Sequence, residues 1–238
     1  MFQVFYKSDV GQKRKNNQDS MGINEALKLF VIADGMGGHK GGETASRQTV
    51  KIIEACFEKK KKIKDPEAMI LAAFQKANQE VYLHSVEEEN LRGMGTTCSL
   101  IFLDDKIHMG HVGDSRVYLI KDDIKQVSVD HTLVERLIAK GEIKREEGLN
   151  HPQKHMITRA LGTATELKVD YAVFNLDEAK HILICSDGLT GKVEDCEIFR
   201  IIKDNPDQSG VDELVKLAND RGGDDNISVV LLSSVDCI

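Results

Sequence analysis

VIADGMGGHKGGETA, residues 31–45, joins an apolar strand to a backbone that is almost bare of side chains. The apolar run from Leu29 to Ala33 is nearly continuous, which predicts a strand buried on both faces. The next residue is a carboxylate, Asp34, and a carboxylate is costly to bury unless something pairs with it. Five glycines follow within eight residues, and glycine lets a backbone come close to a ligand or to another segment. The stretch therefore predicts both a buried strand and a site at its end.

The same pattern recurs elsewhere in the chain. The stretch HILICSDG, residues 181–188, also ends an apolar strand with Asp-Gly. Five acids terminate or adjoin expected strands: Asp19, Asp34, Asp114, Asp187 and Asp225. A single acid of this kind is most often a turn former or a helix cap. Five such acids, three of them beside a glycine, favour a common functional site instead.

Convergence of these strand ends would bring the carboxylates close enough to repel one another, and a divalent cation would relieve that repulsion. Oxygen ligands favour Mg²⁺ or Mn²⁺ over zinc. Two such ions can share a bridging carboxylate and activate a water, and the carbonyl of Gly35 could be a further ligand. Arg14 is a candidate for holding an anionic substrate, because arginine binds phosphate through two hydrogen bonds. The alternative for Arg14 is an exposed surface charge.

The order of the expected elements indicates an α+β fold in one domain, residues 1–238, since no Pro/Gly/Ser-rich linker divides the chain. Helical periodicity predicts helices at residues 43–58, 66–89, 131–140, 194–203 and 208–220. Strands are expected at residues 4–8, 29–33, 181–185 and 227–235. The three apolar runs within residues 96–120 predict an antiparallel meander. Residues 141–162 are polar and irregular, and a connection of that length is often functional.

Composition and charge weigh against several classes of protein. The formal net charge of −7 argues against a non-specific nucleic-acid surface. Five cysteines without a Cys-x-x-Cys pair indicate reduced thiols. The N-terminal stretch lacks the apolar core of a signal peptide, and no apolar run approaches the roughly 20 residues that span a bilayer. These features predict a cytoplasmic protein that binds neither nucleic acid nor membrane.

Several classes of enzyme are disfavoured because their signature motifs are missing from the sequence. The glycine-rich stretch fits neither the Walker phosphate loop nor G-x-G-x-x-G. The signatures of cysteine-dependent and aspartyl-phosphate phosphatases are missing, and so is the G-x-S-x-G motif. Ser186 is therefore interpreted as a structural hydroxyl rather than a nucleophile. His39, inside the glycine-rich stretch, could protonate a leaving group or face solvent, and the sequence leaves both options open.

Taken in order, several stretches resemble the metal-dependent serine/threonine protein phosphatases of the PP2C (PPM) type. The resemblance runs almost from end to end and is strongest with the small bacterial stand-alone members that reverse Hanks-type serine/threonine kinases. It rests on SDVGQKRKNNQDS (8–20), VIADGMGGHKGGETAS (31–46), GMGTTCSLIFL (93–103), HVGDSRVYLI (111–120), DHTLVERLIAKGEI (130–143), HPQKHMITRALGT (151–163), LICSDGLTGKV (183–193) and GGDDNISVVLL (222–232).

The resemblance implies an α-β-β-α four-layer sandwich, in which two packed antiparallel sheets are flanked by helices. It also implies a centre for two Mn²⁺ or Mg²⁺ ions at one end of the sandwich. Asp34 would bridge both ions, and Gly35 would contribute its carbonyl. Asp187 and Asp225 would complete the ligands, and Asp114 would form a third metal site together with Asp187.

Two further residues have roles that the resemblance implies. Asp19 would orient a metal-bound water, and Arg14 would hold the phosphate of the substrate. Residues 131–162 would form a mobile flap near the cleft. The implied reaction is hydrolysis of phosphoserine or phosphothreonine by a hydroxide that bridges the metals, without a phosphoenzyme. The implied partners are phosphorylated proteins, among them a cognate serine/threonine kinase, and the implied state is a monomer.

The chain departs from the family pattern at two positions. Gln18 stands where many members have glutamate, so it is not expected to be a metal ligand. Met36 stands where animal members often have histidine, which leaves His39 or a metal-bound water as the general acid. Three rival functions are weighed: a non-catalytic binder of phosphoproteins, a phosphatase that serves a sigma-factor switch, and a metal-dependent phosphodiesterase or nuclease.

Overall fold

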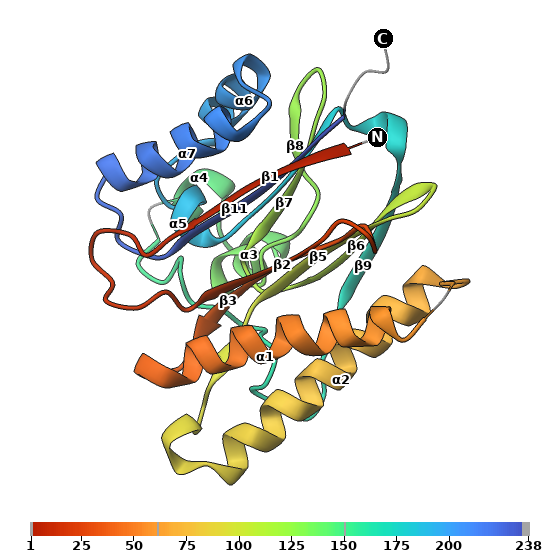
Figure 1. Cartoon of the computed structure of the whole chain (residues 1–238). Helices are drawn as coiled ribbons and strands as arrows, with labels where there is room; N and C mark the ends of the chain where they lie inside the picture. Colours follow the sequence, from red (N-terminus) through yellow and green to blue (C-terminus); the bar gives the residue numbers. More distant parts are fainter. Residues whose placement is uncertain (1, 61, 150, 235–238) are drawn as a thin grey trace.

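Two antiparallel sheets pack against each other at the centre of the structure (Figure 1). The structure is a computed structural model that describes residues 2–60, 62–149 and 151–234. At residues 38–40 and 149 it describes the backbone alone. The first sheet has the strand order β1 (Phe2–Asp9), β11 (Ile227–Ser234), β10 (His181–Cys185), β7 (Arg116–Ile120) and β8 (Ile124–Gln126). The second has the order β2 (Asp19–Asn24), β3 (Leu29–Met36), β5 (Cys98–Leu103), β6 (Lys106–Val112) and β9 (Asp170–Asn175), and β4 (Gly95–Thr96) also pairs with β3.

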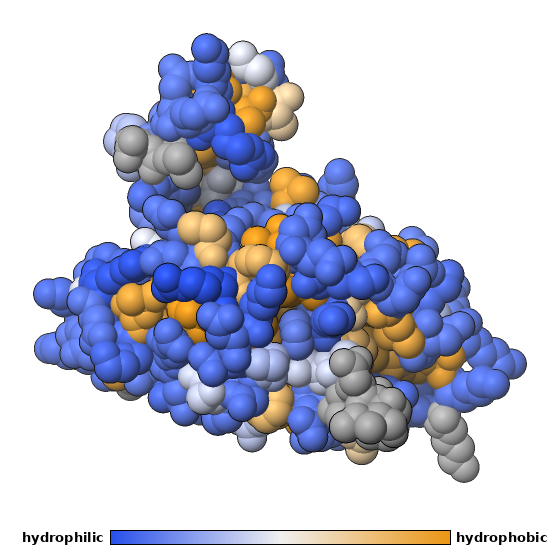
Figure 2. All heavy atoms as spheres, turned by 90° about the horizontal axis from the view of Figure 1, so that it is seen from above, coloured by the Kyte–Doolittle hydropathy of each residue, from blue (hydrophilic) through white to orange (hydrophobic). Residues whose placement is uncertain are grey.

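Helices cover the outer face of each sheet and complete the four layers (Figure 1). The second sheet is covered by α1 (Gly38–Glu58) and α2 (Pro66–Glu87), and the first by α5 (Asp187–Thr190), α6 (Asp195–Asp204) and α7 (Gln208–Asp220). Shorter helices are η1 (Glu89–Leu91), α3 (Leu133–Ala139), α4 (Arg145–Leu149) and η2 (Leu176–Glu178). The expected α+β sandwich of two packed antiparallel sheets flanked by helices is thus confirmed. Seen from above, the surface is mostly hydrophilic, with small hydrophobic patches (Figure 2).

The central strands are apolar throughout because both of their faces are buried. On β10, Ile184 faces the core between the sheets, whereas Leu183 faces the helices. On β3, Ile32 faces the core between the sheets, whereas Val31 faces the helices. Successive side chains of a strand point to opposite faces, so a strand between two apolar layers needs an unbroken apolar run. This explains the buried strand expected from Leu29 onward.

The boundary between β3 and α1 differs from the expectation. The strand continues past residue 33 to Met36, and the helix begins at Gly38 rather than at residue 43. A Cβ atom on Gly35 would lie 2.0 Å from the carbonyl oxygen of Gly42. The strand end and the first turns of the helix therefore touch backbone to backbone, and only glycine permits that contact. Several glycines that suggested a loop belong to this strand–helix junction.

The meander expected within residues 96–120 was wrong in its second half. β5 and β6 form a hairpin, and the turn is closed by the N–H of Lys106, which donates to Asp104 Oδ1 at 2.8 Å. β6 and β7 belong to different sheets. The short segment between them therefore carries the chain from one sheet to the other.

Two strands of the second sheet, β2 and β9, were not predicted. β2 reads DSMGIN and has only weak strand propensity, and its Gly22 packs so tightly that a Cβ atom would lie 2.9 Å from the side chain of Val50. The other expected strands and the helices at 131–140, 194–203 and 208–220 agree with the structure to within about two residues. Helix α2 ends at Glu87, two residues before the expected end, and Val235, expected to end the last strand, lies outside the described residues.

The segment 131–162, expected to form a flap, leaves and rejoins the fold at neighbouring points. The N–H and the hydroxyl of Thr158 both donate to the carbonyl of His131, at 2.7 and 3.0 Å. Between these ends lie α3, which was expected, and the short helix α4, in a region expected to be irregular. The four cysteines within the described ranges are free thiols. No helix in the described ranges has both the length and the apolar character needed to cross a membrane.

Candidate functional site

One end of the sandwich gathers the five acids that the sequence singled out. Asp34 on β3 lies directly opposite Asp19 on β2 in the strand register. Asp187 begins α5, just after β10, and Asp225 lies just before β11. Asp114 lies in the segment that crosses from β6 to β7. Adjacent antiparallel strands bring one strand's end beside the next strand's start, so residues far apart in sequence meet here.

The pKa values of these acids reflect their burial and their mutual repulsion. Burial raises the pKa of Asp34 well above its usual value, and nearby charges raise it further; these belong to Asp19, Asp187, Asp114 and Asp225. Burial likewise raises the pKa of Asp19 to about 6 and that of Asp114 to about 8. The pKa of Asp187 is also raised, first by burial and then by the charge of Asp225. A group of carboxylates with this much mutual repulsion needs protons or a cation.

Three of these acids each have a buried oxygen that lacks a hydrogen-bond partner in the described parts of the chain: Asp19 Oδ1, Asp114 Oδ1 and Asp187 Oδ1. Most buried polar atoms in proteins are satisfied, so such an oxygen needs an explanation. A divalent cation with oxygen ligands would satisfy all three, and the donor set fits Mg²⁺ or Mn²⁺. No three carboxylate, thiolate or imidazole groups among the described residues could hold an ion by themselves. A cation here would therefore also need the Gly35 carbonyl or water as ligands.

Asp34 is held in place through its main chain. Its N–H donates to Thr97 Oγ1 at 2.9 Å, and its carbonyl accepts from the N–H of Thr97 at 2.8 Å and from Thr96 Oγ1 at 2.9 Å. These hydrogen bonds fix the main chain that carries the Asp34 carboxylate. On the opposite strand, Asp19 Oδ2 accepts a hydrogen bond from Ser186 Oγ at 2.8 Å. The role of Ser186 in the structure is that of a hydrogen-bonding hydroxyl.

Arg14 lies against the acid cluster. Its Nη2 donates to Asp225 Oδ2 at 2.7 Å, and about half of the Arg14 side chain is exposed. This hydrogen bond and the charges of Asp225, Asp34 and Asp187 raise the pKa of the guanidinium. The arrangement places a permanent cation at the solvent side of a group of acids, where it can contact an anionic ligand.

Sequence reasoning missed Asn226, which fixes the loop that carries Arg14. Asn226 is 3% exposed. Its Oδ1 accepts from the N–H of Gln18 at 2.8 Å, and its Nδ2 donates to the carbonyls of Val10 and Asn16 at 2.9 and 3.0 Å. The only sequence signal was its position directly after Asp225, because its partners lie about 200 positions earlier in the chain.

Gln18 and Met36, the two departures from the family pattern, lie in different surroundings. The carbonyl of Gln18 accepts from Ser46 Oγ at 2.6 Å and from the N–H of Gly35 at 3.1 Å, so Gln18 supports the site through its main chain. Met36 is half-buried at the end of β3. The side chain of His39 lies outside the described residues.

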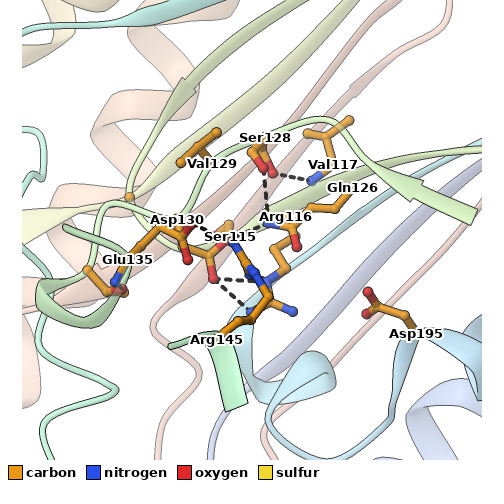
Figure 3. Close-up of polar contacts among 12 residues, drawn as sticks. Ser115, Arg116, Val117, Gln126, Ser128, Val129, Asp130, Glu135, Arg145 and Asp195 are labelled. Carbon is orange, nitrogen blue, oxygen red and sulfur yellow. Dashed lines mark hydrogen bonds and ion pairs between the residues drawn. The ribbon is translucent and has the colours of Figure 1, made fainter. Parts of the chain in front are cut away.

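The base of the flap is tied to the segment that carries Asp114. Arg116 donates through Nε and Nη2 to the carboxylate of Asp130, at 2.8–3.1 Å (Figure 3). Next to Asp130, His131 exchanges two hydrogen bonds with Gly113. At the other end of the flap, Arg159 Nη1 donates to Asp170 Oδ1 on β9 at 2.7 Å. His155 of the flap is near enough to Asp187 for its charge to lower the pKa of that acid. The flap therefore lies beside the acid cluster.

Comparisons with known proteins show which sequences and structures this chain is similar to. The family model of protein phosphatase 2C matches residues 11–221. The serine/threonine phosphatase stp of Listeria innocua is 35% identical over 236 residues, which cover 95% of this chain and 94% of that protein. The crystal structure of the serine/threonine phosphatase Stp1 from Staphylococcus aureus is similar with a TM-score of 0.93 and 34% identity, over 99% of this chain and 96% of that one. A structure of the catalytic domain of the serine/threonine protein phosphatase PstP with two manganese ions has a TM-score of 0.87 and 32% identity, over 99% of both chains.

Proposed function

This chain belongs to the protein phosphatase 2C family, and on that premise we propose that it hydrolyses phosphoserine and phosphothreonine in proteins with the help of bound Mn²⁺ or Mg²⁺. The observation that carries the proposal is the set of three buried carboxylate oxygens, on Asp19, Asp114 and Asp187, that have no partner among the described residues and lie beside the cation of Arg14. Such a site has little use in the absence of metal, since the unpaired oxygens are costly. With metal bound, it offers positive charge to a phosphate and a means to activate water.

The proposed metal ligands are Asp34, Gly35, Asp187 and Asp225 for two ions, with Asp114 and Asp187 at a third site. Gly35 would contribute its main-chain carbonyl, and Asp34 would lie between the two ions. The bound ions would activate a water and neutralise charge on the phosphoryl oxygens. The acids hold the ions in a part of the fold that the central strands keep rigid.

Two residues of the chain would act on the substrate and on the attacking water. Arg14 would bind the phosphate through its guanidinium, which orients the phosphoryl group and stabilises its charge. Asp19 Oδ2 accepts a hydrogen bond from Ser186, whereas Oδ1, which has no partner among the described residues, would accept a hydrogen bond from a water and so orient it. The hydroxyl of Ser186 is used as a donor to Asp19, and the other acids of the site are proposed metal ligands, so direct attack by water fits better than a phosphoenzyme.

The proposed substrates are phosphorylated proteins, including a serine/threonine kinase whose action the enzyme would reverse. Support comes from the similarity to named serine/threonine phosphatases over most of the chain. We further propose that the protein acts as a monomeric, single-domain enzyme in the cytoplasm.

The proposal is tested with Asp34→Asn, which keeps the shape of the side chain and removes its charge. Loss of this charge should weaken Mn²⁺ binding and reduce phosphate release from a phosphothreonine peptide by at least about a hundredfold, the scale on which electrostatic groups at reaction centres act. Asp122→Asn is the matched control, because Asp122 is an exposed acid outside the site. Activity of Asp34→Asn equal to that of the control would contradict the proposal.

A further inference from the structure

The segment Gly113–Arg116, called here the crossing segment, carries the chain from β6 to β7 and from one sheet to the other. We propose that two buried hydroxyls, Thr97 and Ser115, are positioning residues that fix Asp34 and Asp114 relative to each other. This inference rests on the proposed function, since it concerns the arrangement of the metal ligands. Neither hydroxyl touches the substrate or the reacting atoms.

The two hydroxyls connect the main chain of Asp34 to the residue next to Asp114. Thr97 Oγ1 and Ser115 Oγ are 2.8 Å apart. The N–H of Asp34 donates to Thr97 Oγ1 at 2.9 Å, so the hydroxyl hydrogen of Thr97 is available for Ser115. Ser115 follows Asp114 in the chain. One hydrogen-bonded path therefore leads from the main chain of Asp34, on the second sheet, to the residue beside Asp114.

Close packing holds this pair in a single arrangement. Thr97 is 1% exposed, and Ser115 is fully buried. Gly113 has a φ of +114°, and a Cβ atom there would lie 2.5 Å from Thr97 Cβ. The side chain of Thr97 thus rests on the bare backbone of Gly113 on one side of Asp114, while its hydroxyl meets Ser115 on the other side. A shift of Asp114 relative to Asp34 would break these contacts.

The far side of the crossing segment is fixed to the base of the flap. The N–H of Gly113 donates to His131 Nδ1 at 2.9 Å, and the N–H of His131 donates to the carbonyl of Gly113 at 2.7 Å. Figure 3 shows Ser115 beside Arg116, whose guanidinium reaches the carboxylate of Asp130. The crossing segment is therefore bound at both ends. The hydroxyl pair is its connection to the strand that carries Asp34.

The alternative is that Thr97 and Ser115 only stabilise the fold, as any buried hydrogen bond does. Ser233 distinguishes the two possibilities. It is also buried, at 6% exposed, but it lies at the end of β11 opposite to Asp225. Its hydroxyl donates to the carbonyl of Pro206 at 2.7 Å and lies 3.1 Å from His181 Nδ1. Removal of the Ser233 hydroxyl should cost stability without changing the metal site.

The experiment measures Mn²⁺ binding by calorimetry and thermal unfolding of the metal-free protein for Thr97→Val, Ser115→Ala, Thr97→Ser and Ser233→Ala. Thr97→Val leaves the N–H of Asp34 without its acceptor, so we expect Mn²⁺ to bind about tenfold more weakly, the effect of one lost hydrogen bond. Ser115→Ala should act in the same direction and serves as the second variant if Thr97→Val does not fold. Thr97→Ser keeps the hydroxyl and should bind Mn²⁺ as the wild type does. Ser233→Ala should unfold at lower temperature but keep wild-type affinity.

Wild-type affinity in both Thr97→Val and Ser115→Ala would overturn the positioning role and leave the proposed function intact. An equal loss of affinity in Ser233→Ala would also overturn it, because the effect would then be a general one. If the wild-type protein itself takes up no Mn²⁺, the proposed function fails, and this inference fails with it.

Discussion

Asn226→Ala should destabilise the protein by about 3 kcal/mol, because one buried side chain makes three hydrogen bonds to backbone groups of the loop 10–18. Each such bond contributes about 1 kcal/mol, and a partner left buried and unpaired costs more. At about 2–4 °C per kcal/mol for a chain of this size, the midpoint of thermal unfolding should fall by about 6–12 °C. The loop also carries Arg14, so its release should weaken the binding of a phosphopeptide.

The assay is thermal unfolding followed by circular dichroism in the presence of EDTA, which removes any contribution from bound metal. Asn90→Ala is the matched control: Asn90 is exposed, and within the described residues its side chain makes no hydrogen bond, so the change should stay within about 0.5 kcal/mol. A second readout is KM for a phosphothreonine peptide, which should rise in Asn226→Ala only. A fall of less than about 2 °C in Asn226→Ala would refute the view that this side chain holds the loop.

Two further predictions concern the fold around the site. Gly35→Ala would put a Cβ atom 2.0 Å from the carbonyl oxygen of Gly42; the forced separation of β3 from α1 should destabilise the protein by about 1–3 kcal/mol or more, measured by urea unfolding, and unchanged stability would contradict the close contact. Burial lowers the pKa of His111 from 6.5 to about 3. On acidification, His111 therefore binds a proton in the unfolded chain at a higher pH than in the folded chain. The free energy of unfolding should therefore decrease as the pH falls from 6.5 toward 3, by up to about 1.4 kcal/mol per pH unit. In His111→Gln it should depend less steeply on pH; identical slopes in the wild type and the variant would exclude this contribution of His111.

The layers of the fold were predictable where apolar periodicity is strong. β10 and α7 have the expected bounds, and the helix at 194–203 is shifted by a single residue, because each of them buries a continuous stripe or run. β2 was missed because its residues are mostly small or polar and its place depends on pairing with β3. The turn after β6 was misjudged because sequence cannot tell a hairpin from a change of sheet when both flanking runs are apolar.

The candidate site shows the same division between local and long-range information. Asp34 and Asp187 were recognisable because each follows an apolar strand and precedes a glycine. Their convergence depends on the order of strands in two sheets, which no local pattern contains. Asn226 and Thr97 act through hydrogen bonds to residues far away in the sequence, so their importance becomes visible only when the chain is folded.

Phosphate release from a phosphothreonine peptide, measured for the wild-type protein with Mn²⁺ and then with excess EDTA, tests the central claim most directly. The account predicts release with Mn²⁺, its loss in EDTA, and its return when Mn²⁺ is added in excess of the chelator. Release that continues unchanged in EDTA would contradict a metal-dependent hydrolase, and no release under any of these conditions from a folded protein would contradict a phosphatase.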